Sequence, residues 1–460
     1  MRYTVWVAGS FAKSFKEFHK TVGSPEGAGR SLWPLFIFGV IALFISAAIV
    51  PSFFGKALPL AFFLAPLWMP FLLVTAAWRQ WVLFRQAAFI ASQKYILLEI
   101  RPPRTHAKTP LAMEAVLSGM HIGPGESTWY ARLIKGSVRP WWSLEIAAID
   151  GHLRFFVWTR AQFKHNIEAH FYAQYPGVQI VEVPDYARTI SATTEEWSVW
   201  GCDFVHTKSD PYPIKTYVDY GLDKPAKEHE QTDPLANLLE YLAGFGAGEQ
   251  VWLQFVIRTH KGEKYNKKNA DGSPYTWKEA AMEEIQKIRA RTVGKVKYKD
   301  IFTGEMRETE GFPNPTKGES ETMAAIERNV SKPGFDVGVR IIYVAHPDKF
   351  VGTKIAGIIG LFRQFSSEGL NGFKPKGWLV GFSEYPWEPF LEQRQNIARR
   401  GVVDAYRRRQ FFHEPHKSDS MVMSTEELAT LYHIPSKAIE TPTLARVTSA
   451  TSTAPANLPI

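Results

Sequence analysis

The stretch SLEIAAIDGHLRFFVW, residues 143–158, decides the fold class of this chain of 460 residues. Residues 143–149 and 152–158 are both rich in apolar and aromatic side chains, and Asp150-Gly151 stands between them. Asp-Gly between two such segments is a strong signal for a two-residue hairpin turn, because both residues tolerate the positive φ that this turn requires. The stretch therefore predicts two antiparallel strands.

The residues that follow extend this hairpin into an α+β unit. Residues 160–175 carry apolar side chains at helical spacing and end at Pro176-Gly177. Residues 178–183 and 197–204 have the composition of two further strands. The order strand, strand, helix, strand, with the helix on one face of a sheet, indicates an α/β sandwich of ferredoxin-like type.

A second unit with the same alternation follows. Residues 275–291 and 319–330 have the pattern of amphipathic helices, and residues 335–345 alternate like a strand before another helix at 348–365. Between the first two helices, the Gly- and Pro-bearing stretch 294–317 is expected to be a mobile loop. We therefore expect two related α+β halves.

Two uncharged apolar stretches precede the α+β region, at residues 32–50 and 58–78, with Lys56 as the one charge between them. Each is long enough to cross the roughly 30 Å hydrocarbon core as a helix of about 20 residues. Basic residues gather on both outer flanks, so the positive-inside rule places both ends in the cytoplasm. The sequence predicts a transmembrane hairpin in the cell inner (plasma) membrane, multi-pass, with both termini cytoplasmic. The alternative is a hairpin buried in a soluble core.

The expected organisation follows the order of these patterns. The segments are a cytoplasmic N-terminal segment 1–30, a transmembrane hairpin 31–84, a juxtamembrane helix and linker 85–139 in which Pro102, Pro103 and Pro110 end the helix, a first α+β domain 140–260, a second α+β domain 261–385 with the mobile loop 294–317, a basic helix and a short capped helix 386–435, and an extended C-terminal arm 436–460.

Cysteine content and net charge indicate the compartment and the kind of partner of the protein. The single cysteine, Cys202, excludes an intrachain disulfide and agrees with a reducing cytoplasmic side. The formal net charge of +9 and the pI of about 9.3 favour an anionic partner. Headgroups of the inner leaflet and nucleic acid account for this charge equally well.

Motifs for catalysis are missing from the sequence. A Walker A loop needs a lysine followed by Ser or Thr, because these side chains reach the phosphates and magnesium, and no such loop occurs. His-Glu-x-x-His, Cys-x-x-Cys, Gly-x-Ser-x-Gly and EF-hand patterns are missing too. His165 and His170 are five residues apart and so do not share a helical face, and His413 and His416 have no cysteine or third histidine at metal-binding spacing. We expect no enzymatic activity, no cofactor and no metal site.

A basic segment at residues 394–417 is the first candidate site. Arginine charge interleaved with aromatic rings is typical of sequence-tolerant nucleic-acid binding, and the same helix could lie on anionic lipid or dock an acidic partner. A plain solvated helix face is the remaining interpretation. The cations are Arg394, Arg399, Arg400, Arg407, Arg408, Arg409 and Lys417, and the aromatic residues are Tyr406, Phe411 and Phe412.

A short helix near the C-terminus is the second candidate site. Ser424 and Glu427 have the spacing of a capping box, and Pro435 ends the segment. The helix would have one apolar face and an acidic start, which suits docking to a partner. The residues expected to dock are Glu426, Glu427, Leu428, Leu431 and Tyr432.

Several phrases of the sequence together resemble a known family. AQYPGVQIVEVPDY (173–186), DPLANLLEYLAGFGAGEQVWLQ (233–254) and STEELATLYHIP (424–435) are similar to a region of unknown function that precedes the motor in bacterial membrane-bound ATPases of the type IV secretion and conjugation class, related to HerA and FtsK translocases. In those proteins an arm resembling TPTLARV (441–447) leads to the phosphate loop of the motor. This sequence ends at Ile460, where the motor would begin, so the resemblance implies a motor on a separate polypeptide.

The expected function combines the membrane hairpin with this resemblance. The chain is predicted to be a membrane-anchored, non-catalytic scaffold or accessory subunit of a secretion- or conjugation-like translocation machine, docking a HerA/FtsK-like motor ATPase in trans. The alternative is a membrane-bound nucleic-acid-binding protein that acts without a motor. Expected partners are the membrane and the motor ATPase, with DNA and a second copy of the chain as further candidates.

Overall fold

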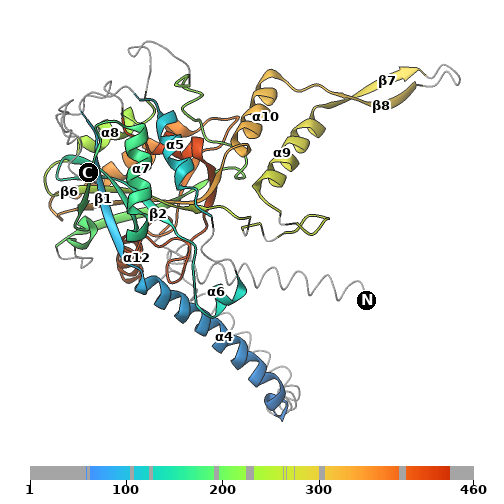
Figure 1. Cartoon of the computed structure of the whole chain (residues 1–460). Coiled ribbons are helices and arrows are strands. Elements are labelled where there is room, and N and C mark those ends of the chain that lie inside the picture. Colours follow the sequence, from blue (N-terminus) through green and yellow to red (C-terminus); the bar gives the residue numbers. More distant parts are fainter. Residues whose placement is uncertain are drawn as a thin grey trace.

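The structure, a computed structural model, describes most of the chain after the first apolar stretch. The described residues are 59, 63–103, 108–123, 128–190, 196–223, 233–262, 264–265, 267–273, 275–299, 306–382 and 390–435. The apolar stretch 32–50 and the arm 436–460 lie outside them. The fold is mixed α+β, and its centre is one large sheet of antiparallel strand pairs with helices on both faces (Figure 1).

The large sheet contains nine strands within the described residues. Their order across the sheet is β10-β5-β9-β6-β2-β3-β1-β4, and β11 pairs with β9 beside this path. The strands are β1 (Tyr95–Arg101), β2 (Trp142–Ile149), β3 (His152–Arg160), β4 (Gln179–Val183), β5 (Ser198–His206), β6 (Glu249–Thr259), β9 (Gly334–Ala345), β10 (Phe373–Lys376) and β11 (Met421–Ser424).

The hairpin predicted at residues 143–158 is confirmed. β2 and β3 pair antiparallel with Ile149 opposite His152. Asp150 and Gly151 both have positive φ, at 50° and 83°, as a two-residue turn of the primed type requires. β2 also pairs along its length with β6, so the hairpin lies inside the sheet and not at its edge.

Among the described residues, seven helices contribute to the two cores on the faces of the sheet, while α9 and α10 pack on each other in a separate small core. A larger core on one face includes side chains from α5, α7, α8, α11 and α13, and a smaller core on the other face includes α12 and the end of α4. The helices are α4 (Ala65–Ser92), α5 (Pro110–Met120), α6 (Trp129–Leu133), α7 (Lys164–Gln174), α8 (Ala236–Ala243), α9 (Trp277–Arg291), α10 (Lys317–Val330), α11 (Gly352–Gly360), α12 (Leu391–Arg407) and α13 (Thr425–Leu431).

The two separate ferredoxin-like halves expected from the sequence merge into one sheet. β9, from the expected second half, lies between β5 and β6, from the first. Every residue of β9 is buried, so this strand has covered faces and paired edges. Local periodicity predicted the strand itself but carries no information about its partners, which are far away in sequence.

The loop expected at residues 294–317 is in large part a two-stranded ribbon. β7 (Val293–Lys299) pairs antiparallel with β8 (Met306–Pro313), and Figure 1 shows the ribbon projecting beyond α9 and α10. Two of the glycines and prolines that suggested a loop have local roles within the ribbon. Gly294 lies at a register shift next to Val293, and Pro313 ends β8.

The juxtamembrane segment also differs from the expectation. The helical continuation ends at Ser92, and residues 95–101 form β1, a buried strand that pairs with both β3 and β4. Pro110 does not break a helix but begins α5, where its missing N–H costs nothing. The sequence pattern predicts a helix that continues to Pro102, because periodicity alone does not separate a short buried strand from a buried helix.

One long apolar helix, rather than the expected hairpin, is what the described residues show. α4 contains much of the second apolar stretch, and it is the one helix among the described residues that is long and apolar enough to cross a membrane. It extends away from the sheet in Figure 1. The first stretch lies outside the described residues.

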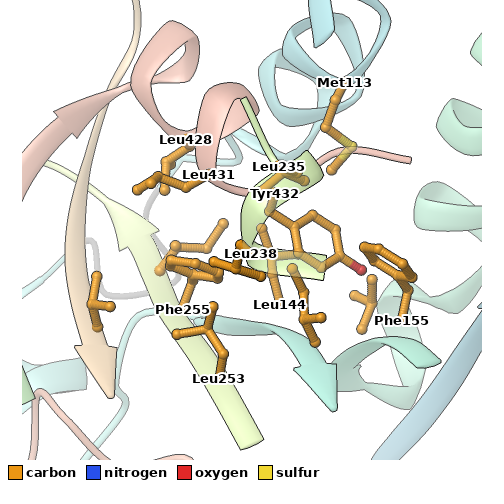
Figure 2. Close-up of a cluster of buried hydrophobic side chains, with 14 of the residues drawn as sticks. Met113, Leu144, Phe155, Leu235, Leu238, Leu253, Phe255, Leu428, Leu431 and Tyr432 are labelled. Carbon is orange, nitrogen blue, oxygen red and sulfur yellow. The ribbon is translucent and has the colours of Figure 1, made fainter. Parts of the chain in front are cut away.

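The C-terminal capped helix is part of the core. All residues of α13 are buried, and Leu428, Leu431 and Tyr432 pack with α5 and α8 side chains over the sheet (Figure 2). The capping box is confirmed, since the Glu427 amide donates to Ser424 Oγ at 3.2 Å and the Ser424 amide donates to the Glu427 carboxylate at 2.9 Å. The prediction that these side chains form a docking surface is therefore wrong, because they are buried.

Both carboxylates of α13 are buried, in different environments. Glu426 lies 2.8 Å from Lys332 Nζ and 3.2 Å from Arg328 Nε, so it has two cationic partners. Glu427 accepts from the Ile214 amide at 3.0 Å in addition to its cap. Burial raises the pKa of the Glu427 carboxyl to about 8, despite these hydrogen bonds.

Replacement of Glu427 by glutamine should change how stability depends on pH. A folded-state pKa above the usual value means that the folded protein binds more protons between pH 4.5 and about 8. The free energy of unfolding of the wild type should therefore fall as pH rises through this window, at up to about 1.4 kcal/mol per pH unit. E427Q keeps a capping side chain and should lose this decline, as measured by urea unfolding in detergent at pH 5 to 8.

The matched control is E319Q, which alters the exposed capping box of α10. Glu319 has a lowered pKa, because the Thr316 amide and hydroxyl donate to it, so E319Q should not reproduce the effect. Parallel pH profiles of wild type and E427Q would contradict the assignment.

Candidate functional site

The basic segment 394–417 forms α12 and the turn that follows it. One face of α12 is buried against the smaller core, through Val402, Val403, Ala405 and Tyr406. The cations of the segment consequently lie in different environments. Arg400, Arg408 and Lys417 are exposed, Arg394, Arg399 and Arg407 are half-buried, and Arg409 is buried.

Arg409 is a structural residue rather than a surface contact. Its side chain is fully buried, and its Nε donates to Glu145 on β2 at 2.9 Å while its Nη2 donates to Asp185 at 2.9 Å. The guanidinium thereby joins the end of α12 to the sheet. The expectation that Arg409 meets a nucleic acid or a lipid is wrong, because its charge is already neutralised inside the protein.

The three aromatic residues of the segment are also in the core. Tyr406, Phe411 and Phe412 are all buried, and the Tyr406 hydroxyl hydrogen-bonds with the Tyr186 hydroxyl at 2.7 Å. The Phe411 ring lies on Gly338 of β9, where a Cβ atom would meet it at 2.2 Å. These rings cannot stack on bases, so the aromatic half of the predicted nucleic-acid interface is wrong.

The remaining cations are partly engaged with the protein itself. Arg407 Nε donates to the Ala187 carbonyl at 2.9 Å, and Arg399 Nη1 donates to Asn396 at 2.9 Å. Arg408 pairs with Asp404 at 2.8 Å on the surface. α12 therefore packs one face against the core and carries exposed arginines on its outer face. This is close to the interpretation of the segment as a plain solvated helix face.

The most unusual surface of the molecule belongs to α4. Its side chains are uncharged from Ala65 to Trp78, and Leu67, Phe71, Leu73 and Val74 are between 61% and 76% exposed. A soluble protein does not leave a continuous apolar helix of this length in water, since burying each such side chain is worth about 1.5–3 kcal/mol. This apolar surface must be shielded from water, and the described residues do not shield it.

α4 is attached firmly to the α+β body at its other end. Phe89 and Ile90 pack against the smaller core, beneath the same face of the sheet that α12 covers. Arg85 Nε donates to the Ile134 carbonyl at 2.9 Å, just after α6. The apolar helix therefore continues into the body without a flexible linker.

A groove at the β10 edge of the sheet is a further candidate site that the sequence did not indicate. It has a volume of about 580 Å³ and lies between edge strand β10, α9 and the residues after β6. Its lining brings together His206, Asp210 and Lys264, which sequence spacing did not suggest. Burial acts to raise the pKa of Asp210, but the hydrogen bond with His206 and the charge of Lys264 lower it overall.

The charge of this groove is nearly balanced. Five lysines of the lining face four carboxylates, so the groove does not form a strong anion site. Lys264 pairs with Asp210, and Lys376 lies 3.5 Å from Asp419. No group of three or more histidine, cysteine or acidic side chains within the described part of the chain could hold a metal ion.

Replacement of Arg409 should destabilise the fold. R409M leaves Glu145 and Asp185 without their buried cation, and breaking such a pair costs about 3–5 kcal/mol. The control R408M removes a surface pair and should cost less than about 1 kcal/mol. Urea unfolding in detergent measures both, and equal stability of the two variants would contradict the structural role. E145Q should recover part of the loss when combined with R409M.

Comparison with protein-family models identifies the domain that makes up most of this chain. A family model described as "Domain of unknown function (DUF8128)" matches residues 86–447. No curated protein matches the chain. The matched region begins within α4, just after the apolar segment, and includes the whole sheet with the helices on both faces. Because the match spans most of the sequence, the chain belongs to the family of this domain of unknown function.

Proposed function

We propose that the chain is a membrane-anchored, non-catalytic platform that serves as an accessory subunit of a translocation machine of the type IV secretion or conjugation kind. One observation carries the membrane anchor in this proposal: α4 is an exposed apolar helix that continues directly into the α+β body. A lipid bilayer is the environment that covers such a helix on all sides. The body would then be held at the membrane in a defined orientation.

The proposal includes the second membrane span. The stretch 32–50 matches the length of a spanning helix and would pair with α4 in a hairpin. Arg79 and Arg85 follow the uncharged part of α4, and few charges separate the two stretches. The positive-inside rule then places the α+β body and both termini in the cytoplasm of a cell with this protein in its inner membrane.

Docking of a motor ATPase in trans is assigned to the arm 436–460. The buried α13 cannot bind a partner through Glu426, Glu427, Leu428, Leu431 or Tyr432, because these side chains are committed to the core. It can instead hold the start of the arm, since residues 431–435 are all buried. The resemblance of this region to chains that continue into a HerA/FtsK-like motor supports a partner of that class.

The alternative, a membrane-bound nucleic-acid-binding protein, now depends on fewer residues. The net charge of +9 and the exposed Arg400, Arg408 and Lys417 favour it. The burial of Arg409 and of the aromatic rings weakens it. We therefore place the scaffold function first.

Embedding of α4 can be tested with single cysteines. A maleimide reacts with thiolate, which does not form in hydrocarbon, so Leu73→Cys in native membranes should be labelled at least about tenfold more slowly than an aqueous cysteine. Met282→Cys on α9 is the aqueous control, since Met282 is 57% exposed. The wild type is the blank, because Cys202 is buried. Equal labelling rates at residues 73 and 282 would contradict the proposed membrane anchor.

Docking can be tested by capture of partners from native membranes. Deletion of residues 436–460 should abolish co-purification of a Walker-motif ATPase, while deletion of residues 2–30 should leave it intact. Retention of every partner without the arm would overturn the docking proposal. Loss of the partner from the complete chain after nuclease treatment would favour the nucleic-acid alternative, because DNA would then be the bridge.

A further inference from the structure

We infer that α6 and the residues just after it form a foot that lies in the headgroup layer of an acidic phospholipid leaflet, beside α4. This inference rests on the proposed membrane anchor and adds a second, lipid-binding contact to it. The foot is defined as residues 129–136.

The composition of the foot suits a membrane interface. α6 has no buried residue, and its Trp129 and Tyr130 are 64% and 49% exposed. Tryptophan and tyrosine prefer the headgroup region, where the ring meets apolar chains and the polar atom meets water. Exposure of two adjacent large aromatic side chains on a five-residue helix has no explanation in the packing of the body.

The charge of the foot is complementary to an acidic leaflet. Arg132 and Lys135 are both exposed, and residues 128–138 contain no acidic residue. Lys135 Nζ lies 5.8 Å from the centre of the Tyr130 ring, so the cation and the aromatic group are on the same part of the surface. Cations near an acidic membrane surface are attracted by its negative potential, so these two side chains favour binding to an acidic leaflet.

The position of the foot relative to α4 is fixed by backbone contacts. Arg85 donates to the Ile134 carbonyl, and Gly136 has φ of 71° with the Arg85 carbonyl 2.3 Å from where a Cβ would lie. A glycine is therefore needed for the close approach. Figure 1 shows α6 alongside α4 and away from the sheet.

The depth of the foot follows from the part of α4 that it accompanies. Trp78 and Trp81 are nearly half exposed at the end of the uncharged segment, and Arg79 lies between them. Arg85 lies 5.8 Å from the centre of the Trp81 ring. Arginines and tryptophans in this order mark the edge of the hydrocarbon layer, so α6 lies at headgroup level.

Labelling of residue 130 in proteoliposomes tests the inference. Tyr130→Cys carries an environment-sensitive fluorophore, and the full chain is reconstituted in phosphatidylcholine with or without phosphatidylglycerol. We expect blue-shifted emission and quenching by headgroup-labelled nitroxide lipid, both stronger with phosphatidylglycerol. The same label at Met282→Cys should report water in both mixtures. R132Q/K135Q should remove the effect of phosphatidylglycerol, whereas K278Q/K317Q, which alters exposed lysines of α9 and α10, should not.

The outcomes separate the foot from the anchor. An aqueous label at residue 130 in a chain that shows slow labelling at residue 73 would overturn the foot and leave the anchor intact. Quenching that is the same in both lipid mixtures would overturn the acidic-lipid specificity. Rapid labelling at residue 73 would remove the basis of both.

Discussion

The complete burial of β9 is the constraint on which the rest of the structure depends. This strand runs through the middle of the sheet, with β6 along one edge and β5 and β11 sharing the other. Both of its faces are covered, because Val337, Val339 and Ile341 lie in the larger core while Ile342 and Val344 lie in the smaller one. Residues 390–435 supply much of this cover: α12 packs on one face, β11 completes the edge and α13 packs on the other face.

This constraint explains the unusual polar residues of the same segment. A chain that passes from one face of a sheet to the other brings charged groups inside, and each needs a partner. Arg340 on β9 pairs with Asp203 at 2.8 Å, Arg409 pairs with Glu145 and Asp185, and Glu426 pairs with Lys332 and Arg328. The pairs of Arg409 and Glu426 define where the segment lies, and they account for residues that resemble a binding site in the sequence.

Features set by neighbouring residues could be predicted from the sequence, whereas environments set by distant residues could not. The Asp150-Gly151 turn and the Ser424-Glu427 cap depend on neighbouring residues, so local patterns predict them correctly. Arg408 and Arg409 are adjacent and chemically identical, yet one is exposed and the other buried. The difference is set by Glu145, which is far away in sequence, and no local pattern reports it. The same argument applies to the foot, whose Trp129 and Tyr130 look like ordinary linker residues until α4 is placed beside them.

The way in which α4 joins the body favours a platform over a tether. A membrane helix followed by a flexible linker would let the attached domain sample many orientations, and the linker would only raise its local concentration. Here α4 remains helical to Ser92, and its last turns contribute Phe89 and Ile90 to the same core as α12. Movement of the body against the helix would have to break this core and the contact between Arg85 and Ile134. The orientation of the sheet is thus fixed relative to α4, and such rigid presentation is what a subunit that positions a partner at the membrane requires.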